Sequence, residues 1–101
     1  MGVDSKPPTI TLTGELPTNR NNPVAIFSWK SDEDAKFTCA VDDPKNTDYC
    51  GYGTYGQHVT PLLPDGEHTF YVTPEDAYGN KGPVVKYTWQ TGNEEMFNFL
   101  V

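Results

Sequence analysis

The sequence predicts an all-β fold, an antiparallel β-sandwich of about seven short strands, and three observations support this prediction. Apolar and polar residues alternate in short runs, as in half-buried strands, and no stretch has a convincing helical period. Turn-forming clusters separate these runs, and most of the nine Pro and nine Gly fall within the clusters. Hydrophobic residues make up only 36% of the chain but aromatic residues 13%, so a few large side chains must form a thin core.

The first three expected strands cover residues 9–14, 24–29 and 35–41. In the first strand, Ile10 and Leu12 share one face while the threonines point to the other. Phe27 and Trp29 line one side of the second strand, and Phe37 points inward from the third. The acidic run DED at 32–34 lies between the second and third strands, and we expect it to be a solvated turn.

The last three expected strands cover residues 58–63, 68–72 and 84–90. Pro61 removes a backbone donor, so the first of these is expected to be a short edge strand. In the second, Phe70 and Val72 point inward, and the third alternates most clearly, with Trp89 inward and Lys86 outward. The expected core anchors are Phe27, Trp29, Phe37, Phe70 and Trp89.

Length and charge limit the classes of function. A chain of 101 residues has room for one domain with a single core. Seven basic and fourteen acidic residues give a net charge of -7, which repels nucleic acid and anionic membranes, so neither is an expected partner. No apolar stretch is long enough to insert into a bilayer. The start MGVDSKPP lacks the apolar stretch of a signal peptide, and we expect a domain taken from a longer chain.

Cys39 and Cys50 are the only two cysteines, and their spacing matches neither a CxxC motif nor a His–Cys metal site. We expect them to form one disulfide, which implies an oxidising compartment. Such a short closed loop stabilises the fold by about 2 to 3 kcal/mol because it restricts the unfolded chain. The alternative is a pair of buried free thiols in a cytosolic protein.

Several motifs occur in a fixed order along the chain: PPTITL, AIFSW, AKFTCAVDD, a Cys at 50, LLPDGEHTFYV, DAYGN and KYTWQ. In this order, over residues 7–91, they resemble a bacterial immunoglobulin-like domain of large surface or secreted proteins. The resemblance implies an immunoglobulin-like or fibronectin-like sandwich of about seven strands, a Cys39–Cys50 disulfide and repetition in tandem. Residues 1–6 are then a linker or tag remnant, and residues 92–101 a C-terminal linker or an extra strand.

The same resemblance implies a non-catalytic module at an extracellular or cell-surface location. Its expected role is that of a structural spacer or adhesion repeat, flanked by neighbouring domains of the parent chain. Enzyme activity is not expected, because the sequence has no G-x-S-x-G nucleophile motif and no phosphate-binding glycine loop before a helix. His58 and His68 are separated by a turn, and a metal pair between them is not expected.

The first candidate site is DAYGN, residues 76–80. Asp76 and Asn80 can hydrogen-bond nearby backbone groups and Gly79 can adopt a positive φ, as a tight turn requires. Their oxygens could also join Glu75 around Ca²⁺, which needs six to eight oxygen ligands. The turn is the preferred interpretation, and a weak calcium site is the alternative; no other cofactor is expected.

The second candidate site is YCGYGTYGQH, residues 49–58. Tyr49, Tyr52 and Tyr55 recur at every third position, a spacing that neither a strand nor a helix places on one face. The preferred interpretation is that one or two of the rings cover the disulfide and the sheet edge, because tyrosine readily caps small cores. The alternative is a mobile loop whose exposed rings stack on a glycan or anchor a protein ligand.

The C-terminal run GNEEMFNFLV is unexpectedly apolar. It could begin the next domain, fold back onto this one, or pair with a free sheet edge of a second copy. We expect a monomer.

Overall fold

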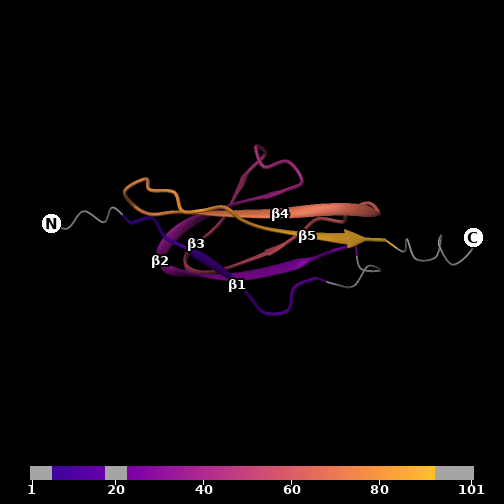
Figure 1. Cartoon of the computed structure of the whole chain (residues 1–101), viewed down its shortest axis with the longest axis horizontal. Coiled ribbons are helices and arrows are strands. Elements are labelled where there is room, and N and C mark those ends of the chain that lie inside the picture. The colour runs from indigo at the N-terminus through magenta and orange to yellow at the C-terminus, as the bar shows by residue number, and fades with distance from the viewer. Residues whose placement is uncertain (1–5, 18–22, 93–101) are drawn as a thin grey trace, which may run out of the picture.

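The computed structural model describes residues 6–17 and 23–92 of the chain. These residues form one antiparallel sheet of five strands (Figure 1). The strands are β1 (Ile10–Thr13), β2 (Ile26–Val41), β3 (Asp48–Val59), β4 (Gly66–Glu75) and β5 (Val85–Thr91). The prediction of an all-β, antiparallel fold is therefore confirmed. Expectations for residues 1–5 and 93–101, including most of the apolar C-terminal run, lie outside the described residues.

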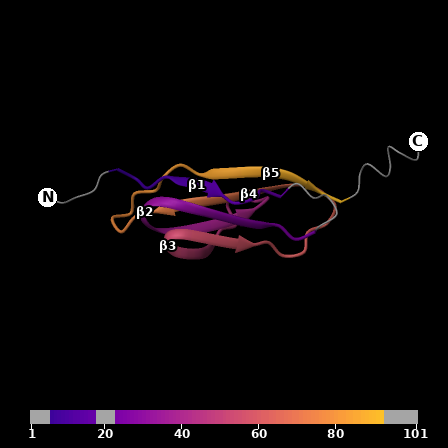
Figure 2. The same ribbon diagram turned by 90° about the horizontal axis from the view of Figure 1, so that it is seen from below.

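The long strand β2 organises the sheet. β3 pairs with β2 along most of its length, whereas β1 pairs with the first half of β2 and β4 with its second half. β5 then pairs with the far edge of β4. A register shift between Lys30 and Ala35 separates the two halves of β2, and the sheet curls at this point. Figure 2 shows the result: β3 and β5 lie on opposite sides, with β2 and β4 between them.

The core lies inside this curl and is largely aromatic. The ring of Phe27 on β2 stacks on Phe70 of β4 with centroids 4.2 Å apart, so the first half of β2 packs face to face with β4. The edge of Trp89 contacts the same Phe27 ring, and Phe37 contacts Trp29 in a similar way. All five expected core anchors are buried.

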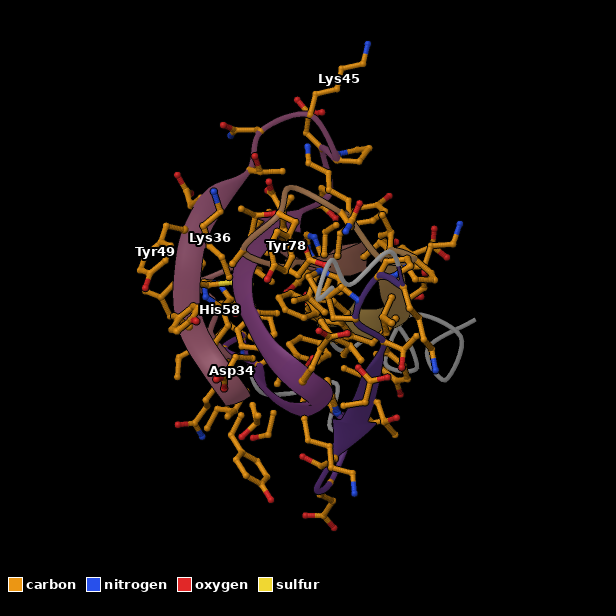
Figure 3. The ribbon with its side chains drawn as sticks, turned by 90° about the vertical axis from the view of Figure 1, so that its left-hand side faces the viewer. Asp34, Lys36, Lys45, Tyr49, His58 and Tyr78 are labelled. Carbon is orange, nitrogen blue, oxygen red and sulfur yellow. A yellow bond between two sulfur atoms is a disulfide. The ribbon has the colours of Figure 1, made fainter. Side chains whose placement is uncertain are left out.

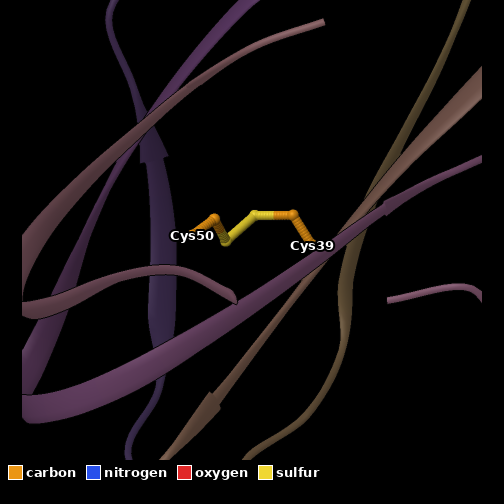
Figure 4. Close-up of a disulfide and its surroundings, with 2 residues drawn as sticks. All are labelled: Cys39 and Cys50. Carbon is orange, nitrogen blue, oxygen red and sulfur yellow. A yellow bond between two sulfur atoms is a disulfide. The ribbon is translucent and has the colours of Figure 1, made fainter. Parts of the chain in front are cut away.

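The disulfide is also confirmed: Cys39 of β2 is bonded to Cys50 of β3 (Figure 4). The bond joins neighbouring strands within one sheet, and its two Cα atoms are 5.9 Å apart. Free thiols, the alternative interpretation, are thus ruled out for both cysteines.

Two expected strands, at residues 24–29 and 35–41, are parts of the single strand β2. The acidic run between them does not reverse the chain, because Asp32 binds the segment that precedes β1. Its two carboxylate oxygens accept hydrogen bonds from the backbone N–H and the hydroxyl of Thr9, each 2.9 Å long. The Thr9 backbone donor is the main reason that the pKa of Asp32 is lowered. The predicted seven-stranded sandwich is therefore wrong, and the structure is a five-stranded curled sheet.

The strand expected at residues 58–63 is also wrong. β3 ends at Val59, and the chain around Pro61 is not part of any strand. Residues 49–58, for which a mobile loop was one interpretation, instead form most of β3. No helix that could cross a membrane occurs in the part of the chain that the structure describes.

Candidate ligand-binding site

Three exposed tyrosines lie along β3. The exposed fractions of Tyr49, Tyr52 and Tyr55 are 66%, 61% and 74%. Their partners on β2, in the same order, are Thr38, Lys36 and Lys30. Residues directly opposite each other in an antiparallel pair project from the same face, and both lysines are exposed. The three rings therefore share the outer face of the sheet. The segment is a strand and not a mobile loop, and the exposure of all three rings favours the binding alternative over rings that cover the disulfide.

Irregular pairing explains how a three-residue spacing keeps to one face. From Tyr49 to Tyr52, β3 advances three residues while β2 advances two, from Thr38 to Lys36. This bulge shifts the alternation by one position, and it contains Gly51, whose φ of 126° favours glycine. The next irregularity lies on β2, between Lys30 and Ala35, and it likewise shifts the alternation so that Tyr55 stays on the same face as Tyr52.

A surface pocket of about 520 Å³ lies beside two of these tyrosines. Its walls come from three strands and the turn that follows β4: Lys36, Tyr49, Tyr52, Glu75, Asp76, Ala77 and Gly79. Lys36 and Tyr49 appear on the same side of the molecule in Figure 3. The pocket thus brings together the two candidate sites, the tyrosine segment and the DAYGN turn. Tyr55 lies outside this pocket.

An ion pair crosses the pocket wall. Lys36 of β2 lies opposite both Tyr52 of β3 and Glu75 of β4, so the three side chains form a row across the sheet. The Nζ atom of Lys36 is 3.7 Å from Oε1 of Glu75. A partly exposed pair of this kind adds little to stability, which leaves its donor and acceptor atoms usable by a ligand. Nothing in the sequence singles out Lys36, because its place in the pocket depends on strand pairing.

The DAYGN turn is built around Asp76. One carboxylate oxygen accepts hydrogen bonds from the backbone N–H groups of Tyr78 and Asn80, and the other accepts one from the side chain of Asn80. Gly79 has a φ of 86°, as the tight turn requires. Burial raises the pKa of Asp76, but these hydrogen bonds outweigh burial and lower it. Asp76 therefore shapes the pocket floor by fixing the turn.

Calcium at Asp76 and Asn80 stays a prediction. Both oxygens of Asp76 already accept hydrogen bonds within the turn. Within residues 6–17 and 23–92, no group of three or more His, Cys, Asp or Glu side chains is placed to hold a metal ion.

The two histidines occupy separate environments. His68 is buried at the end of the core, where one ring nitrogen contacts Asp42 and the other contacts the carbonyl of Pro64. His58 lies opposite Phe27 and stacks on Phe70, and burial lowers its pKa although Asp48 partly opposes this shift. Neither histidine lines the tyrosine pocket.

A second surface pocket, of about 460 Å³, lies at the other end of the tyrosine row. It is lined by Tyr55, Gly56 and Gln57 of β3, by Ser28 and Trp29 of β2, and by Thr13 of β1. Gly56 lies directly over the indole of Trp29, and a side-chain carbon at this position would overlap the ring. Glycine at position 56 therefore leaves room for the Trp29 indole on the inner face of the sheet.

No family model and no curated protein sequence matches this chain. Its structure is similar to the crystal structure of CopC from Methylosinus trichosporium OB3b, with a TM-score of 0.53. The alignment covers 82% of this chain and 93% of that chain, at 9% sequence identity. At this identity the similarity concerns the fold alone.

These findings correct the expected function. The interpretation as an immunoglobulin-like spacer or adhesion repeat is wrong, because the chain forms a five-stranded curled sheet that is similar in fold to the structure of CopC. The resemblance to bacterial immunoglobulin-like domains in sequence motifs stays a prediction, since no family model supports it.

Proposed function

We propose that this domain binds a neutral, hydroxyl-rich ring compound of the saccharide class in the pocket beside Tyr49 and Tyr52. The observation that carries the proposal is the presence of two exposed aromatic rings and one ion pair on the same pocket wall. Aromatic rings stack on the C–H faces of sugar rings, and exposed tyrosines do so while their hydroxyls stay in water.

Charge favours a neutral ligand over a charged one. The net charge of -7 repels anions from the domain as a whole. Inside the pocket, the ammonium of Lys36 opposes a cation while Glu75 opposes an anion. Together they present donors and acceptors to hydroxyl groups, as polar residues in ligand pockets commonly do.

The proposed role is binding without catalysis, in a secreted or extracellular setting. The disulfide between Cys39 and Cys50 supports that setting, because such bonds persist in oxidising compartments. The pocket walls contain no histidine and no cysteine. Their one buried carboxylate, Asp76, is hydrogen-bonded within its turn, which supports a structural role for it.

The test is a titration of the whole chain with glucose, N-acetylglucosamine, cellobiose and chitobiose, followed by calorimetry and by amide chemical shifts. We expect at least one disaccharide to bind, and Tyr52→Ala to weaken its binding by about tenfold through loss of stacking. Tyr78→Ala is the matched control, because Tyr78 is 60% exposed but does not line the pocket. Absence of binding to every sugar, or equal losses in the two variants, would overturn the proposal.

A further inference from the structure

We infer that the ligand is an extended, linear oligosaccharide that lies along β3 and spans both surface pockets. This inference rests on the proposed function and adds a second subsite, at Tyr55, together with the shape of the ligand. The two pockets lie at opposite ends of one row of exposed rings, and both are lined by that row.

The surface along β3 repeats one chemical unit. Tyr52 lies opposite Lys36, and Tyr55 lies opposite Lys30, so an exposed ring and an exposed ammonium recur as a pair along the strands. Each pair offers a stacking surface and a hydrogen-bond donor side by side. A repeated site of this kind fits a polymer made of repeated units better than it fits a single small molecule.

The spacing of the tyrosines along β3 matches the repeat of a linear sugar chain. Three residues of an extended strand span about 10 Å, which is close to the length of one disaccharide. A linear sugar chain placed along β3 therefore presents a sugar ring to Tyr52 and, two units further on, another to Tyr55. Tyr49 lies three residues beyond Tyr52 in the other direction and continues the same row across the bulge.

The second subsite is polar. Its wall residues Gln57 and Ser28 lie opposite each other on β3 and β2, two positions along from Tyr55 and Lys30, and supply amide and hydroxyl groups. A sugar ring stacked on Tyr55 can hydrogen-bond to these groups.

An extended peptide is the competing ligand. Peptides that add to a sheet bind through the backbone of an edge strand, whereas the tyrosines and lysines project from the face. Binding through the edge of β3 would therefore depend little on the Tyr55 ring.

The test compares two series of sugars by calorimetry on the whole chain: cellobiose, cellotetraose and cellohexaose, and the chito-oligosaccharides of the same lengths. We expect affinity to increase by at least about tenfold from the disaccharide to the hexasaccharide. Tyr55→Ala should remove this gain while the disaccharide still binds through Tyr52, whereas Tyr52→Ala should weaken the binding of both lengths. Tyr55→Phe keeps the ring and should keep most of the gain.

The outcomes are distinguishable. Equal affinities for the short and long sugars, or a length gain that survives in Tyr55→Ala, would overturn this inference and leave the proposed function standing if the disaccharide binds through Tyr52. Failure of all sugars to bind would overturn both. Circular dichroism of each variant confirms that the fold is retained.

Discussion

The Nδ1 atom of His68 lies 2.7 Å from the Oδ2 atom of Asp42, although the two residues are far apart in the sequence. Its Nε2 atom lies 2.7 Å from the carbonyl oxygen of Pro64. Ionised carboxylates and carbonyls only accept hydrogen bonds, so only the doubly protonated imidazolium satisfies both contacts. Burial lowers the pKa of His68, but the hydrogen bonds to Pro64 and Asp42 outweigh burial and raise it above its ordinary value of 6.5.

We therefore predict that alkaline pH weakens the fold through His68. A group with a raised pKa in the folded state stabilises fully below its unfolded pKa, and this stabilisation is lost as the pH rises through the folded pKa. The melting temperature should fall as the pH is raised above 6.5 into the alkaline range, and His68→Gln should remove most of this decline. A wild-type melting temperature that stays constant over this range would contradict the prediction.

His58 provides the control, because its pKa is shifted the other way. Burial against Phe70 lowers the pKa of His58 below 6.5, so its contribution is present above pH 6.5 and is lost as the pH falls through the folded pKa. His58→Asn should leave the alkaline decline intact and reduce the decline on the acid side. Equal effects of the two histidine variants on the alkaline side would show that the assignment to His68 is wrong.

A second prediction concerns Asp76 and calcium. Asp76→Ala should lower the melting temperature at neutral pH, because it removes the acceptor of three hydrogen bonds that fix the turn. Calcium should leave the wild-type melting temperature unchanged relative to chelator, since both carboxylate oxygens are already engaged. A rise with calcium that disappears in Asp76→Ala would establish the calcium site instead.

A third prediction concerns the contact between Gly56 and Trp29. Gly56→Ala should destabilise the fold by about 1 to 3 kcal/mol, as overpacking of a dense core usually does. In a Trp29→Phe background the added methyl has more room, so the same substitution should cost less. Nε1 of Trp29 has no hydrogen-bond partner among the described residues, so Trp29→Phe strands no acceptor. Denaturant unfolding of the four proteins measures the coupling, and additive losses would contradict the prediction.

A fourth prediction concerns the disulfide. Replacing both Cys39 and Cys50 with Ala should lower the free energy of unfolding by about 2 to 3 kcal/mol, because the bond closes a short loop between positions 11 residues apart. Reductant should have a comparable effect on the wild type and none on the variant. An unchanged denaturation midpoint after reduction would contradict this estimate.

The sequence predicted the core better than it predicted the strands. Alternation identified Phe27, Trp29, Phe37, Phe70 and Trp89 because burial selects apolar residues locally, on one face of each strand. Whether two runs form two strands or one depends on distant partners. The hydrogen bonds from Thr9 to Asp32 hold an acidic run in an extended bulge, and nothing near Asp32 in the sequence indicates them.

The sequence did not predict β3, the strand that carries the three tyrosines, for a related reason. The alternation rule fails across bulges, and Gly51 and Gly53 read as turn residues when they are the positive-φ positions of an irregular strand. A signal was nevertheless present. A disulfide between Cys39 and Cys50 with a turn between them is typical of a hairpin, which places a second strand directly after the turn. The pocket itself could not be predicted, since Lys36 and Glu75 meet only through strand pairing.

The length of β2 has a consequence for how the chain acquires its structure. β2 pairs with β1, β3 and β4, whereas β5 pairs only with β4. Without β2, therefore, only β4 and β5 could still pair with each other. β1 precedes β2 in the chain and β4 follows it, so each of these pairings closes its own loop. Closing such loops is slow relative to local pairing. Folding should therefore begin at the β2–β3 hairpin and finish only when β1 and the β4–β5 pair have joined β2, which makes the late steps the ones most exposed to aggregation.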